Sequence, residues 1–74
     1  MKTIIDIAFD IGHDICADGT SGYHFIVRTH SSDVFRGVPE TEYPRNVVVL
    51  DHTGGVPTPI IPLSSIESIT VIEV

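Results

Sequence analysis

Cysteine, positive charge and long apolar runs are all scarce in this sequence. Its 74 residues include one cysteine, Cys16, so no intrachain disulfide can form. No apolar run approaches the roughly 20 residues that span a bilayer. The N-terminal stretch is interrupted by Asp6 and Asp10, which argues against a signal peptide. We therefore expect a cytoplasmic protein without membrane association, folded as a single domain over residues 1–74 and stabilised by packing alone or by a partner.

The small number of basic residues limits the class of partner. Ten acidic residues face four basic ones, for a formal net charge of −6. The basic residues are Lys2, Arg28, Arg36 and Arg45. Nucleic-acid phosphates are bound by clustered lysine and arginine, and four scattered cations do not form such a cluster, so we expect no direct nucleic-acid binding. The acidic excess serves either solubility or the recognition of a basic partner.

The opening stretch MKTIIDIAFDIGHDIC fits a helix over more residues than it fits a strand. A strand would alternate only from Ile5 to Ile11. At about 100° per residue, the polar residues up to Asp14 fall within one arc, and the apolar residues fill the remainder. Thr3 is a suitable N-cap, and Asp6 follows at the N3 position of a capping box. We predict a helix whose wide apolar arc is largely covered, with one narrow acidic edge in water.

The rest of the chain reads as short strands separated by turns. A polar loop, residues 17–22, follows the helix, and Gly54-Gly55 predicts the turn of a hairpin. LSSIES predicts one helical turn. Pro57, Pro59 and Pro62 lack amide donors, which places their strand at an edge or a bulge. The expected strands are residues 23–29, 34–38, 46–51, 56–61 and 69–74. The fold class is therefore α+β, an N-terminal helix packed on a small, strongly bent antiparallel sheet or barrel of about five strands.

Three segments carry a resemblance to a known family. SDVFRGV, NVVVL and IPLSSIESITVIE resemble the layout of Sm-like and SH3-like small β-barrels, in which a helix precedes five bent strands. Phe35 and Gly37 match the aromatic residue and the glycine of the first motif, and Asn46 stands before an apolar strand. The second motif, which holds the RNA-binding arginine and glycine, is missing. The resemblance therefore points to Sm-like proteins that bind other proteins, such as acidic inhibitors of transcription termination factors.

Few residues have the spacing that catalysis or metal binding requires. His13 and Cys16 form an H-x-x-C pair, but a structural zinc site needs four ligands, so we expect a buried Cys16 and a solvent-edge His13. His30, Ser31 and Asp33 have the residue types of a hydrolytic triad, yet neighbours on one turn rarely converge, and a turn explains them better. We expect no catalytic residues, no metal site and no cofactor.

The carboxylates are the strongest candidates for function. Asp6, Asp10 and Asp14 recur at every fourth position, so they would line one helix edge about 6 Å apart, comparable with phosphates along a strand. The proline-bounded connection adds Glu40, Glu42 and an exposed interface tyrosine, Tyr43. A solvated helix face remains the simpler explanation of the row.

Two functional hypotheses follow. The first is a non-enzymatic inhibitor, monomeric or homodimeric, that covers the nucleic-acid-binding surface of a larger basic protein. In size and charge the chain is similar to small phage-encoded inhibitors such as anti-CRISPR proteins. The alternative is an Sm-like small-barrel module that binds RNA or a ligand. A small metal-binding protein is a third possibility.

Overall fold

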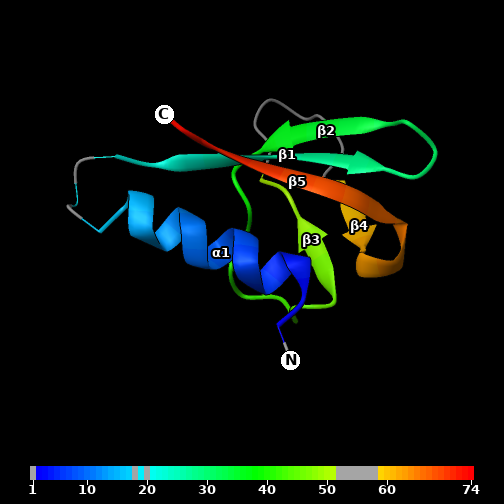
Figure 1. Cartoon of the computed structure of the whole chain (residues 1–74), viewed down its shortest axis with the longest axis horizontal. Coiled ribbons are helices and arrows are strands. Elements are labelled where there is room, and N and C mark those ends of the chain that lie inside the picture. The colour runs from blue at the N-terminus through cyan, green and yellow to red at the C-terminus, as the bar shows by residue number, and fades with distance from the viewer. Residues whose placement is uncertain (1, 18, 20, 52–58) are drawn as a thin grey trace.

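The computed structural model describes residues 2–17, 19, 21–51 and 59–74, and contains one helix followed by five strands (Figure 1). The elements are α1 (Ile4–Ile15), β1 (Tyr23–Thr29), β2 (Val34–Gly37), β3 (Val47–Val49), β4 (Ile60–Pro62), the 3-10 turn η1 (Leu63–Ser65) and β5 (Ile66–Glu73). All strand pairs are antiparallel. The predicted α+β class is confirmed.

Helix α1 begins with the predicted capping box. The backbone N–H of Asp6 donates to Thr3 Oγ1 over 3.3 Å, and the backbone N–H of Thr3 donates to Asp6 Oδ2 over 3.0 Å. These bonds satisfy two backbone donors in the first helical turn, where no intrahelical partner exists. The helical interpretation of the opening stretch is confirmed, and its N-terminal boundary is set by this cap.

The strands form two sheets that are joined edge to edge. One sheet has the order β2-β1-β5, and the other pairs β3 with β4. A bridge between Pro39 and Leu50 connects them, since the N–H of Asp51 donates to Val38 O (2.7 Å). The strand path is therefore β5-β1-β2-β3-β4, and among the described residues it does not close into a barrel. A Cβ on Gly37 would lie 3.0 Å from the carbonyl oxygen of Asp51, so a larger residue at this junction would have to displace the neighbouring backbone slightly.

The predicted strands are found, with shifts at their ends. β1 coincides with residues 23–29, whereas β5 begins at Ile66, three residues before the expected start at 69. The predicted helical turn is thus shorter, because pairing with β1 extends β5 back to Ile66 opposite Thr29. β4, which contains Pro62, ends the strand path, as the prolines predicted. The Gly54-Gly55 turn and Pro57 lie outside the described residues.

The core lies between α1 and the sheet. Phe25 and Val27 from β1 are fully buried, as is Ile5 from α1. The Phe9 and Phe25 rings meet edge to face with centroids 5.0 Å apart, a favourable aromatic geometry. Phe35 is half-buried against this core. No helix in the described part of the chain is long and apolar enough to cross a bilayer.

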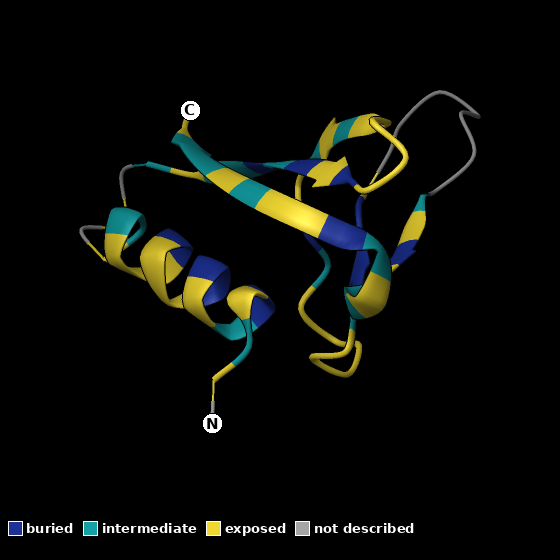
Figure 2. Ribbon diagram, turned by 45° about the vertical axis from the view of Figure 1, so that its right-hand side comes forward, coloured by how far each residue is buried: buried dark blue, intermediate teal, exposed yellow. Residues whose placement is uncertain are grey.

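The apolar arc of α1 is less covered than the sequence predicted. Ile4, Ile7 and Ile11 remain 41%, 48% and 46% exposed, and Cys16, expected to be buried, is half-buried. Figure 2 shows buried α1 residues on the side toward the sheet and exposed ones around the rest. The outer isoleucines stay exposed because the sheet does not extend beneath the whole helix. α1 packs mainly on β5, which is an edge strand, so no further strand covers the outer isoleucines.

Candidate functional site

The predicted acidic row is present on α1, and its members differ in surroundings. Asp10 and Asp14 are exposed, and Asp6 is half-buried. Their spacing of four residues places them on one edge of the helix, away from the core residues Ile5 and Ala8. The row therefore has the geometry that the sequence predicted, and the availability of each carboxylate depends on its own contacts.

Asp6 is occupied by contacts within the chain. Its carboxylate completes the capping box with Thr3, and Oδ1 lies 3.9 Å from Nε of Arg45. The Asp6 side chain is only 29% exposed. These contacts give Asp6 a structural role at the start of α1, which limits what it can offer to a partner.

Asp10 forms an ion pair with Lys2, whose ammonium group donates to Oδ2 of Asp10. The hydrogen bond from Lys2, and then its positive charge, hold the pKa of the Asp10 carboxyl below its ordinary value despite some desolvation. Both side chains are more than half exposed, so solvent screens this pair. Of the row, Asp14 makes no ion pair with a described residue.

The connection between β2 and β3 carries the other predicted residues. Glu40 is half-buried and its N–H donates to Val49 O over 2.8 Å, whereas Glu42 is exposed and Tyr43 is 45% exposed. Tyr43 therefore lies at the surface, as an interface residue must. Glu40 contributes to the junction of the two sheets through its backbone.

Arg45 attaches this connection to α1, and the sequence analysis did not identify it. Its guanidinium carbon lies 3.9 Å from the centroid of the Phe9 ring, within the range of a cation–π contact. Figure 1 shows the connection running beside the helix. The structure thus joins Arg45, which follows residues 40–43 in the connection, to Phe9 and Asp6 of α1. A single basic residue in a polar segment gave no sequence signal of this contact.

A second surface feature, also missed, is an apolar groove of about 390 Å³ between α1 and β5. We call it the α1–β5 groove. Its lining residues are Ile4, Ile7, Ala8, Ile11, Glu67, Ser68, Ile69 and Val71. The hydrophobic pattern of α1 contained the signal, since three isoleucines share one arc. The pattern does not show that β5 is the last strand on that side.

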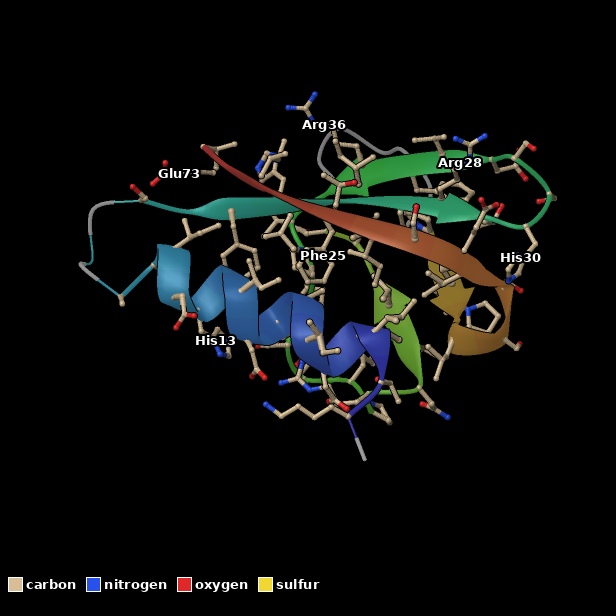
Figure 3. The ribbon with its side chains drawn as sticks, in the orientation of Figure 1. His13, Phe25, Arg28, His30, Arg36 and Glu73 are labelled. Atoms are coloured by element: carbon tan, nitrogen blue, oxygen red, sulfur yellow. The ribbon has the colours of Figure 1, made fainter. Side chains whose placement is uncertain are left out.

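The outer face of the three-stranded sheet carries the remaining arginines. Arg28 on β1 and Arg36 on β2 point away from α1 (Figure 3). Arg28 lies opposite Val34, and Ile26 lies opposite Arg36, so the two arginines are diagonal neighbours on one face. Neither arginine forms an ion pair with a described residue. These two positive charges therefore lie on the face of the sheet that is turned away from α1, whereas Lys2 and Arg45 lie beside its acidic edge.

The residues considered for metal binding or catalysis do not come together as a site in the described part of the chain. In the described part of the chain no group of three or more potential ligands gathers, and His13 is exposed at the helix surface. The Ser31 hydroxyl donates to Oδ2 of Asp33 (3.0 Å), and the N–H of Ser32 donates to Thr29 O (3.0 Å). Ser32 takes a positive φ of 72°. This geometry is that of a tight turn between β1 and β2.

Comparison of the chain with protein-family models, with curated proteins and with solved structures finds no match.

Proposed function

We propose that this chain is a non-enzymatic, cytoplasmic inhibitor that binds a larger basic protein and excludes nucleic acid from its surface, in the manner of anti-CRISPR proteins. The observation that supports the proposal is the contact of Arg45 with Phe9 and Asp6, which places the acidic edge of α1 beside the connection that carries Glu42 and Tyr43. We infer that the carboxylates of this helix edge and the connection carrying Glu42 and the exposed Tyr43 act together as one surface toward the partner.

The charge available on this surface is smaller than the sequence count suggests. Lys2 and Arg45 partly neutralise Asp10 and Asp6, whereas Asp14 and Glu42 form no ion pair with the residues that the structure describes. A basic groove on a partner would gain charge-assisted contacts from these two residues, and Tyr43 would contribute buried area at the same interface. Exclusion of nucleic acid then follows from occupation of the groove.

The test is competition for a captured partner. Immobilised chain is incubated with lysate of the native host, and retained proteins are eluted with duplex DNA or with RNA at constant ionic strength. We expect elution by nucleic acid and loss of capture in an Asp14→Lys, Glu42→Lys double variant. Asp6 is left unchanged, because its replacement would remove the helix cap.

The matched control places the same change of charge elsewhere. Asp33→Lys alters the turn between β1 and β2, away from the α1 surface, and should leave capture intact. A retained protein that nucleic acid cannot displace, or that binds the double variant as well as the wild type, would contradict the proposal.

The alternative, an Sm-like module that binds RNA, is favoured by one observation. Arg28 and Arg36 lie on the same outer face of the three-stranded sheet, where they could contact phosphates together. A mobility shift with single-stranded RNA that disappears in an Arg28→Glu, Arg36→Glu variant would support this alternative. Equal migration of RNA with and without protein at low salt would remove it.

A further inference from the structure

The α1–β5 groove has an apolar floor that the fold leaves exposed. Ile7 and Ile11 are each nearly half exposed along one side, and Ile69 and Val71 of β5 lie half-buried along the other. Removing such apolar surface from water is favourable. Binding of an occupant with apolar side chains would therefore be favourable, because it would remove this surface from water.

The open edge of β5 runs along this groove. Gly22 and Val74 exchange both backbone hydrogen bonds, at 3.4 and 3.1 Å, so they form a hydrogen-bonded pair of the antiparallel ladder. Pairs alternate along such a ladder, and Val71 and Ile69 therefore direct their N–H and C=O groups away from β1. Among the described residues, no backbone group pairs with them on that side.

An edge strand of this kind is a template for another strand. β5 spans eight residues and contains no lysine and no proline, the residues that usually protect an exposed edge. A β-bulge between Arg28 and Thr29 interrupts the β1–β5 pairing, but only near the N-terminal end of β5. An extended segment laid along β5 would satisfy the open backbone groups and place alternate side chains over Ile7 and Ile11.

The charges around the groove indicate which segment fits. Glu67 lines one end of the groove, and Glu73 (labelled in Figure 3) ends β5 at the other. No lysine or arginine is among the described residues that line the groove. A complementary strand has two apolar residues at alternate positions and a basic residue at each end.

A second copy of this chain fits this pattern poorly. In a symmetric antiparallel pairing centred on Thr70, Glu67 of one copy would approach Glu73 of the other, and this would occur twice. Like charges opposite each other across a strand pair are destabilising. Each copy also carries a net charge of −6. The charge distribution favours a basic segment of a different protein.

We propose that the α1–β5 groove binds an extended, basic-flanked segment of a partner protein, which adds to β5 as an antiparallel strand. Its apolar side chains lie opposite Val71 and Ile69, and its terminal cations lie beside Glu73 and Glu67. This site is on the opposite flank of α1 from Arg45 and does not depend on the function proposed above.

The test uses a synthetic peptide, Lys-Thr-Ile-Thr-Val-Thr-Lys with blocked ends, and the full chain. Titration followed by amide NMR should show binding at least about tenfold tighter than for the peptide with glutamates in place of both lysines. In a Glu67→Lys, Glu73→Lys double variant this preference should reverse. Such a reversal identifies the two ends of the groove as the charge contacts.

Backbone pairing has its own control. N-methylation of the third and fifth peptide residues removes the donors that would face β5 and should abolish binding, whereas N-methylation of the fourth residue should not. On the protein, hydrogen exchange should slow at Ile69 and Val71, and stay unchanged at Thr70, whose N–H already faces β1.

Three results would overturn the proposal. The first is equal binding of the two N-methylated peptides. The second is the absence of any shift at Ile69 and Val71 with the lysine peptide. The third is gel filtration showing a dimer that an Ile7→Glu substitution dissociates, because a second copy would then occupy the edge. None of these results bears on the acidic surface at Asp14 and Glu42, so the two proposals fail separately.

Discussion

The guanidinium group of Arg45 stacks on the ring of Phe9, with 3.9 Å between the guanidinium carbon and the ring centroid. The same group has its Nε 3.9 Å from Oδ1 of Asp6. A polar, proline-bounded connection is thereby attached to α1 by one side chain. Phe9 is itself 3% exposed, and the arginine covers part of its ring from solvent.

Replacement of Arg45 by alanine should destabilise the domain by about 1 kcal/mol, because the variant loses the cation–π contact and the packing of the aliphatic stem. The measurement is urea unfolding followed by circular dichroism. Arg36→Ala is the matched control, since Arg36 is exposed on the outer sheet face, and its cost should stay within about 0.5 kcal/mol. Equal costs would show that the Arg45 contact contributes nothing to stability.

Gly12 should resist the substitution that normally stabilises a helix. Gly-to-Ala in a helix interior gains about 1 kcal/mol from propensity. Here a Cβ would lie 2.5 Å from Cε2 of Tyr23, whose ring also packs beside Phe25 and His13. Overpacking costs about 1–3 kcal/mol, so Gly12→Ala should be neutral to destabilising.

A double-mutant cycle isolates this contact. In a Tyr23→Ala background the obstructing ring is gone, and Gly12→Ala should then stabilise the domain by about 1 kcal/mol. Thermal unfolding of the four proteins gives the coupling energy. An identical effect of Gly12→Ala in both backgrounds would mean that Tyr23 does not restrict the helix.

The elements of this fold follow closely from local sequence. Thr3 and Asp6 mark the start of α1 because capping requires only residues three apart, and β1 is delimited by turn residues on both sides. β5 was predicted too short, because its first residues gain their partner from Thr29, which is distant in sequence. Local patterns show which residues can form a strand, and they do not show where a partner strand ends.

The candidate site could be predicted only in part, for the same reason. The spacing of Asp10 and Asp14 places them on one helix edge whatever the rest of the chain does. The ion pair with Lys2, and the contact of Arg45 with Asp6, depend on tertiary placement, and they determine which carboxylates remain available. The exposure of Ile7 likewise depends on β5 being the last strand of its sheet.

The Lys2–Asp10 pair predicts a measurable titration. Lys2 lowers the pKa of Asp10, so the pair stabilises the fold above the ordinary aspartate pKa, and this contribution is lost as the pH falls through the lowered value. Carbon-13 NMR of the side-chain carboxyl should give a pKa below that of an unpaired aspartate. In Lys2→Gln the pKa of Asp10 should rise toward its ordinary value, because the hydrogen bond and the positive charge of Lys2 are lost. The same pKa in both proteins would show that the pair does not persist in solution.

The exposed isoleucines should contribute little to folding, in contrast to their buried neighbours. Ile7 is 48% exposed and Ile5 is fully buried, although both are isoleucines of one helix. Ile7→Ala should cost less than about 1 kcal/mol, since alanine is the better helix former and half the side chain is already in water. Ile5→Ala should cost about 2–5 kcal/mol, and Ile5→Val, the variant that keeps the fold, about 0.5–1.5 kcal/mol.

Denaturant unfolding of these three variants compares the two sides of α1. If Ile7→Ala lowered the free energy of unfolding as much as Ile5→Ala does, the stability of the fold would be enough to explain an isoleucine at position 7. The case for a partner at the groove would then weaken. A small cost leaves an apolar surface that the folded chain does not need for its stability. Exposed apolar groups that do not stabilise the domain are the ones a binding interface can use, because their burial then adds entirely to the free energy of association.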